Sequence, residues 1–164
     1  MELVASWAYD NWFDLLDSAV ILAGLAFTAF ELRRARNATL VSNRLAIGEA
    51  HRELTLFRLS QPKLSRVKDT KVDLSKKPLN SFESDWLSLK FLHLAGCFFA
   101  AEKGQYERPE RLVDDIRAFL KLPKPRAAWD EWKSFQNQRF VAFVEKCSAS
   151  DGSPKATNEI LKNI

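Results

Sequence analysis

An apolar stretch close to the start of the chain constrains the fold more than any other feature. It runs from Trp12 to Phe30, and a basic cluster with Arg33, Arg34 and Arg36 follows it directly. As an α-helix this stretch would be roughly 28 Å long, close to the roughly 30 Å hydrocarbon thickness of a bilayer. The pattern predicts a single transmembrane helix over residues 12–30, with the arginines as its anchor at the inner leaflet.

Charge on the two sides of this stretch predicts its orientation. The preceding residues carry Glu2 and Asp10 but no Lys or Arg, whereas arginines follow the stretch. Cytoplasmic flanks are enriched in Lys and Arg, so we expect residues 1–11 outside a bacterial inner membrane and the remainder in the cytoplasm. Asp14 and Asp17 fall within the stretch, where a carboxylate is costly unless it lies at the interface or against a protein partner. The alternative is an ordinary buried helix of a soluble protein.

The predicted membrane helix also carries neighbouring stripes of small residues. Small side chains let transmembrane helices approach closely, and Asp17 would prefer a watery lumen or a second helix to lipid. This arrangement predicts a homo-oligomer whose anchors could line a pore. A monomeric tether, in which the alanines only favour helix formation, fits the same residues. The small residues are Ala19, Ala23, Gly24, Ala26 and Thr28.

The remaining chain has the pattern of a helical domain. Its two cysteines, Cys97 and Cys147, lie in apolar helical contexts, which argues against a disulfide scaffold and for a reducing compartment. We therefore predict an all-α protein whose N-terminal transmembrane helix continues into a cytosolic helical bundle over residues 31–147. A flexible C-terminal tail is expected over residues 148–164.

Breaker and capping residues predict the helix boundaries within this domain. The first helix should continue to Leu59, because Gln61-Pro62 stops it, and Asn80 with Glu83 resembles a capping box. A lysine-rich loop is expected between them. The predicted ranges are Lys68–Leu79 for the loop and Ser81–Lys103, Pro109–Leu120 and Ala127–Lys146 for the helices that follow.

The chain has a net charge of +4, and many of its cations cluster near the predicted loop. Such a cluster could bind an anionic ligand such as a nucleotide, RNA or lipid headgroup. A solvated lysine loop is the alternative, since no glycine-rich phosphate motif accompanies it. The cations near the loop are Lys63, Arg66, Lys68, Lys71, Lys76 and Lys77, and Lys121, Lys124 and Arg126 form a second group.

His93 and Cys97 are separated by one helical turn. They could join His51 and Cys147 around a zinc ion, because tetrahedral zinc accepts two nitrogens and two sulfurs. Nothing in the spacing requires such a site, and packed side chains are the simpler interpretation. We predict no metal and no cofactor.

Several motifs resemble a known type of protein. Leu32-Arg33-Arg34 after the membrane segment, Gln61-Pro62-Lys63-Leu64, and the stretch from Ala128-Trp129 to Phe140-Val-Ala-Phe-Val144 resemble a class of uncharacterised bacterial single-pass proteins with a helical domain. The layout is also similar to small membrane effectors found beside CRISPR and other phage-defence systems. That resemblance implies an antiviral effector that oligomerises and perturbs the membrane on receipt of a cytosolic nucleotide, RNA or protein signal.

Arg44 and His51 suggest a different activity. Their spacing resembles the Arg-x(4–6)-His motif of HEPN ribonucleases, in which the histidine exchanges protons with the ribose hydroxyl or leaving group and the arginine stabilises the phosphate. Here Leu45 follows the arginine, where those nucleases commonly carry a polar residue. The resemblance implies a membrane-tethered ribonuclease with Arg44 and His51 as catalytic residues. A membrane adaptor with neither pore nor catalysis is the third alternative.

Overall fold

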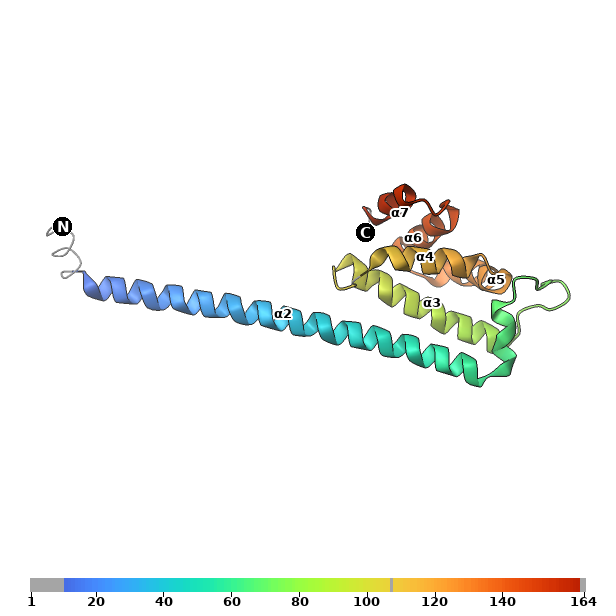
Figure 1. Cartoon of the computed structure of the whole chain (residues 1–164), viewed down its shortest axis with the longest axis horizontal. Helices are drawn as coiled ribbons and strands as arrows, with labels where there is room; N and C mark the ends of the chain where they lie inside the picture. The colour runs from blue at the N-terminus through green and yellow to red at the C-terminus, as the bar shows by residue number, and fades with distance from the viewer. Residues whose placement is uncertain (1–10, 107, 163–164) are drawn as a thin grey trace. The chain divides into compact units, whose positions relative to one another are not determined.

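The computed structural model describes residues 11–106 and 108–162, and these residues form an all-helical fold, as predicted (Figure 1). The predicted N-terminal segment 1–11 lies outside the described residues except for Asn11. The elements are α2 (Trp12–Ser60), η1 (Pro62–Lys68), α3 (Ser81–Glu102), α4 (Pro109–Leu120), α5 (Pro123–Trp132), η2 (Lys133–Phe135), α6 (Gln138–Ala149) and α7 (Pro154–Leu161).

The chain divides into two units, Met1–Ser42 and Asn43–Ile164. In the first unit α2 stands alone, and every side chain that the structure describes between residues 12 and 39 is exposed. Among the described residues, α2 is the helix long and apolar enough to cross a membrane. Its predicted end is confirmed, because α2 stops at Ser60 and Gln61 is extended before Pro62.

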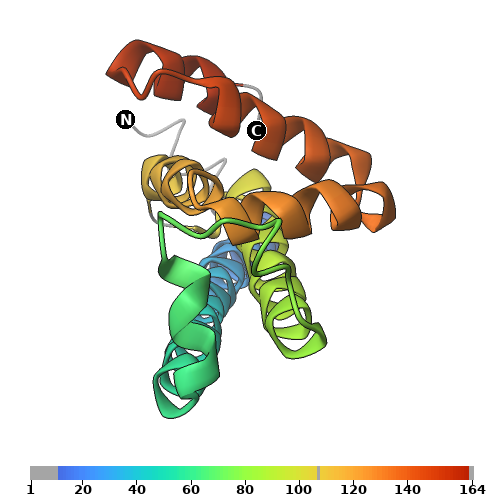
Figure 2. The ribbon, with the colours of Figure 1, turned by 90° about the vertical axis from the view of Figure 1, so that its right-hand side faces the viewer.

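The core of the second unit is built around α3. The elements η1, α4 and α5 pack against α3, and α6 and α7 pack against α4 (Figure 2). Aromatic side chains fill much of this core: the ring centroid of Phe91 lies 5.2 Å from that of Trp129, and the centroid of Phe98 lies 4.8 Å from that of Phe143. Packing on several sides requires α3 to be apolar around most of its circumference. Leu89 and Leu92 nevertheless point outward and are 51% and 64% exposed.

The predicted capping box at the start of α3 is confirmed. Asn80 Oδ1 accepts a hydrogen bond from the Glu83 amide at 2.8 Å, and Glu83 Oε2 accepts one from the Asn80 amide. The Glu83 carboxylate is fully buried and also pairs with Arg66 of η1 and Lys124 of α5. The predicted surface position of Lys124 is wrong, because this pairing takes its side chain into the core. One acidic residue thus joins three elements.

The prediction of one helix over Ala127–Lys146 is wrong. The chain breaks at η2, and Asn137 then caps α6 by accepting a hydrogen bond from the Arg139 amide. The break lets α5 pack against both α3 and α4, while α6 packs against α4 and α7. Phe135 lies at the break and is 84% exposed rather than part of the core.

The predicted tail over residues 148–164 also differs from the structure. Ser153 caps α7 through its side chain, and Thr157 and Ile160 of this helix are buried. Arg117 of α4 reaches across to donate hydrogen bonds to the side chains of Ser150 and Thr157. Helix α7 has two buried side chains and is hydrogen-bonded to α4, so it is part of the folded unit.

Candidate anion-binding pocket

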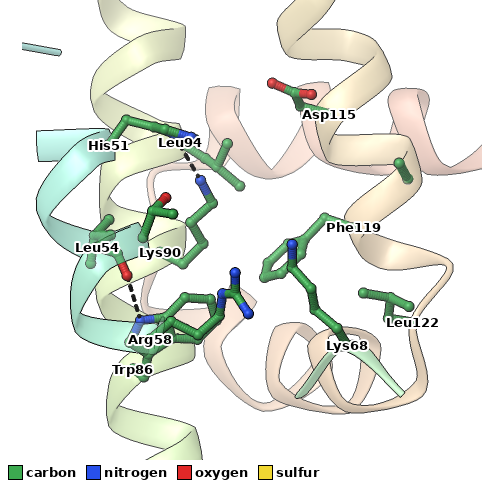
Figure 3. A pocket seen from close by; sticks show the side chains of 12 residues that line it. His51, Leu54, Arg58, Lys68, Trp86, Lys90, Leu94, Asp115, Phe119 and Leu122 are labelled. Atoms are coloured by element: carbon green, nitrogen blue, oxygen red, sulfur yellow. Dashed lines mark hydrogen bonds between the residues drawn. The ribbon is translucent and has the colours of Figure 1, made fainter. Parts of the chain in front are cut away.

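A pocket of about 450 Å³ lies in the second unit between α2, α3 and α4 (Figure 3). Three cations, Arg58, Lys68 and Lys90, extend into it from α2, η1 and α3. Trp86 and Phe119 form the aromatic part of the pocket wall. His51 and Asp115 lie toward one end, and the remaining wall consists of Leu54, Thr55, Leu94, Ala118 and Leu122.

The part of α2 that lines the pocket contributes residues one helical turn apart. His51, Leu54, Thr55 and Arg58 share one face because they are spaced three or four positions apart. Two polar contacts join this face to α3: Lys90 Nζ lies 3.4 Å from His51 Nδ1, and Trp86 Nε1 donates to the Leu54 carbonyl at 3.4 Å. These contacts hold α2 beside α3 and leave the space toward α4 open.

The ion pairs of the buried Glu83 carboxylate position Lys68, one of the three pocket cations. Arg66 Nε donates to Glu83 Oε1 at 3.0 Å, and Leu64 and Val67 of the same short helix are fully buried. These anchors fix η1, whose last residue is Lys68. The exposed Lys68 side chain therefore enters the pocket from a rigid support instead of from a free loop.

Charge in the pocket is unbalanced. Burial lowers the pKa of Lys90, and nearby Lys68 lowers it further, whereas Asp115 raises it. Burial likewise lowers the pKa of His51, aided by Lys90 and Lys68 and opposed by Asp115. Among the described lining residues, one carboxylate thus faces three cations and a histidine. An anion entering the pocket would relieve this repulsion and stabilise the charged forms.

His93 and Cys97 lie beside the pocket on α3. The His93 ring centroid is 5.6 Å from that of His51, and Cys97 Sγ lies 3.7 Å from His93 Nε2. Burial, together with Lys90 and His51, lowers the pKa of His93 to about 4, so the ring is neutral near pH 7. Cys147 is buried elsewhere, on α6, and burial raises its thiol pKa to about 12. No cluster of three or more potential metal ligands occurs among the described residues.

The structure does not bring the predicted ribonuclease residues into one pocket. His51 lines the pocket described above, whereas Arg44 lines a different one with Ile47 and Gly48. His51 Nδ1 faces Lys90 instead of Arg44. A pair that acts on one phosphate would need to converge on it, and this pair lies on successive sections of α2.

Of the basic residues predicted near the loop, only Lys68 lines this pocket. Arg66 supports η1 through Glu83, and Lys76 pairs with Asp73 at the surface. Sequence reasoning missed Arg58, Lys90 and Asp115. Lys90 had a usable signal, because it is a lone cation within the apolar helix α3. The other predicted cations outside the pocket are Lys63, Lys71 and Lys77, which are exposed.

The predicted membrane-facing residues all lie on the first part of α2. Their side chains are exposed, and Thr28 donates its hydroxyl hydrogen to the Gly24 carbonyl at 2.8 Å. A Cβ added at Gly24 would meet no atom within 4 Å. This face is therefore open to a neighbouring helix. Its residues are Asp17, Ala19, Ala23, Gly24, Ala26 and Thr28, and the basic residues Arg33, Arg34 and Arg36 that follow are also exposed.

No family model, curated protein or solved structure matches the chain. The resemblances drawn from its motifs therefore stay predictions.

Proposed function

We propose that this chain is a membrane-anchored effector that binds an anionic nucleotide or RNA-type ligand in its helical unit and responds by perturbing the membrane. The observation that carries the proposal is the convergence of Arg58, Lys68 and Lys90 on one pocket walled by Trp86 and Phe119. Arginine and lysine bind phosphate oxygens, and aromatic side chains stack on bases. The combination favours a ligand that carries both groups.

Electrostatics supports an anion as the occupant. Lys90 is half-buried close to Lys68, and Asp115 is the carboxylate that lines this pocket. Holding like charges together in a partly desolvated space is unfavourable unless a ligand neutralises them. Purely structural cations would more often resemble Lys124, which is paired directly with a buried carboxylate. The pocket cations lack such close compensation.

Helix α2 supplies the link to the membrane. It contributes one wall of the pocket, and the same helix contains the apolar segment long enough to span a bilayer. An anion bound between α2 and α4 would attract the cations on both sides of the pocket and so displace α2. The polar contacts of α2 with α3 at His51 and Leu54 are few. A shift or rotation of α2 is the kind of movement that changes how membrane helices pack.

Self-association through the anchors completes the proposal. The small residues on the first part of α2 permit close helix contact in lipid, with Asp17 facing a partner or water. Changing Ala23 and Gly24 together to leucine should disrupt the oligomer because the larger side chains separate the helices. Mass photometry of the full chain in detergent measures this directly. An unchanged assembly size would remove this face from the interface.

Dye release from liposomes tests the function as a whole. The full chain is reconstituted with an entrapped fluorophore, and adenosine monophosphate or a short RNA is added. We expect ligand-dependent leakage that Arg58→Gln with Lys90→Met abolishes, whereas Lys71→Gln with Lys77→Gln, which alters the same number of cations outside the pocket, leaves it intact. Leakage that occurs without ligand and is unchanged by the pocket substitutions would contradict the proposal. Ligand binding without leakage would instead favour an adaptor.

A further inference from the structure

A second basic pocket, of about 290 Å³, lies between α2 and the start of α4. Arg44, Arg108 and Arg111 line it. Ile47, Gly48 and Tyr106 complete the lining. Arginine binds phosphate through paired N–H groups, so three of them around one space favour a phosphate oxyanion.

Local structure explains why the arginines meet there. Gly104, at φ 64°, ends α3 and turns the chain back toward α2. The Tyr106 side chain is partly buried against the core, which holds its ring at the edge of the pocket. Arg108 immediately precedes α4, and Arg111 lies in its first turn. Both arginines are therefore held on the ordered start of a helix.

The two pockets follow one another along the same helix faces. On α2 the lining passes from Gly48 to His51, and on α4 from Arg111 to Asp115, about one turn in each case. On α2 the lining residues of the two pockets lie on average about eight positions apart. Arg108 and Arg111 precede the α4 lining residues of the larger pocket by about eight positions on average, so the two sets are offset along each helix by roughly 12 Å at 1.5 Å per residue. Both helices give the same spacing.

We propose that the two pockets form one groove for a short single-stranded oligonucleotide, with one phosphate held in each pocket. This inference rests on the proposed function and names its ligand more closely. Aromatic rings occur at both ends, with Tyr106 at one and Phe119 and Trp86 at the other. Cations alternating with stacking surfaces are typical of single-strand binding sites.

Asp115 distinguishes this ligand from a plain polyanion. It follows Arg111 of the arginine pocket by about one turn of α4 and precedes Ala118 and Phe119 of the larger pocket. A continuous chain of phosphates would have to pass this carboxylate. An oligonucleotide instead places a sugar or base between its phosphates, and a ribose hydroxyl or a base amino group can donate a hydrogen bond to Asp115.

Binding of fluorescein-labelled ribo-oligonucleotides by the full chain in detergent, measured by fluorescence anisotropy, tests the groove. A series from one to four nucleotides should gain affinity steeply until the ligand reaches both pockets and then level off. Arg108→Gln with Arg111→Gln should weaken binding of the tetranucleotide at least tenfold but that of the mononucleotide less than twofold. Lys71→Gln with Lys77→Gln is the matched control, and helical content is compared by circular dichroism.

The outcomes separate this inference from the proposed function. Equal effects of the arginine changes on long and short ligands, or none on either, would overturn the groove. So would failure of the unmodified chain to bind the tetranucleotide, or equal binding of a linear polyphosphate of similar length. Arg58→Gln with Lys68→Gln should weaken mononucleotide binding, and no change there would instead remove the larger pocket from the proposed function.

Discussion

The two units of the chain use the same apolar residue types in opposite surroundings. Leu22 and Phe27 in the first unit are 66% and 65% exposed, whereas Leu87 and Phe91 in the second are 0% and 1% exposed. The second unit buries its side chains against its own helices. The first offers a continuous exposed apolar surface, which in a soluble protein would be an aggregation hazard and in a bilayer is the expected state. Composition alone therefore does not distinguish the two units, whereas the presence of packing partners does.

The largest expected effect of a substitution sharpens this contrast. Phe91→Ala should lower the free energy of unfolding by about 3 to 5 kcal/mol, because it leaves a cavity beside Phe119 and Trp129. Phe27→Ala should leave it within about 0.5 kcal/mol, since surface substitutions have small effects. Urea unfolding of the full chain in detergent, followed by tryptophan fluorescence, measures both. Equal losses would mean that the first unit has a protein core of its own.

The buried ion pair should have the next largest effect. Lys124→Met leaves the Glu83 carboxylate buried with only part of its compensation, at a cost of about 3 kcal/mol. Adding Glu83→Gln should recover part of that loss because it removes the buried charge. The same unfolding measurement checks both variants. If Lys124→Met were as stable as the unmodified chain, the network would not secure η1, and Lys68 would lose its support.

The pH dependence of ligand binding should follow His51. Burial and the nearby lysines lower its pKa below the ordinary value of 6.5 in the empty pocket, and a bound anion would raise that pKa again. Binding then takes up a proton, so affinity should fall as the pH rises from about 5 to 7. Isothermal titration calorimetry in buffers of different ionisation enthalpy detects this proton. The ligand is a dinucleoside monophosphate, because its phosphodiester, unlike the phosphate of adenosine monophosphate, does not titrate in this range. A His51→Gln variant that keeps the full pH dependence would assign it to another group.

Acid should also destabilise the second unit through His93. Its pKa is about 4 in the folded protein, below its ordinary value of 6.5, so the unfolded chain binds a proton that the folded chain does not. Stability is therefore lost as the pH falls from about 6.5 toward 4. His93→Gln should flatten the decline of the melting temperature over this range. An unchanged decline would show that the ring is not held neutral.

The smallest expected effect concerns glycine. Gly96 lies within α3, and a Cβ added there meets no atom within 4 Å, so Gly96→Ala should stabilise the second unit by about 0.5 to 1 kcal/mol. Gly24→Ala has equally open surroundings but lies on the first part of α2, and should leave the unfolding of the second unit unchanged. The midpoints of urea unfolding, compared between the two variants and the unmodified chain, measure both effects. A matching gain from both would mean that the units unfold together.

Local signals predicted much of the helical framework. Gln61-Pro62 ends α2, Asn80 and Glu83 cap α3, and Pro109 opens α4, because each of these acts through its immediate neighbours. The break between α5 and α6 was missed because it depends on which helix each segment packs against. The burial of Lys124 was missed for the same reason, since its partner Glu83 is remote in sequence.

The candidate pocket was even harder to predict from local sequence, because it depends on contacts between remote segments. Its cations come from three elements brought together by packing, and only Lys68 lay in the basic cluster that sequence predicted. Arg58 is a charge on a long helix with an exposed apolar surface around it, and such charges usually mark solvated positions. Sequence can place a cation on a helix, but convergence on one space depends on the arrangement of η1, α3 and α4 around α2.

The central claim is that the apolar part of α2 lies in lipid while the helical unit meets water. A nitroxide spin label at Ala23→Cys, with Lys71→Cys as the aqueous control, tests it in liposomes containing the full chain. Electron paramagnetic resonance should show the Ala23 label accessible to oxygen and protected from a water-soluble nickel reagent, with the opposite result at Lys71. A label at Ala23 that the nickel reagent reaches as freely as the label at Lys71 would contradict the account.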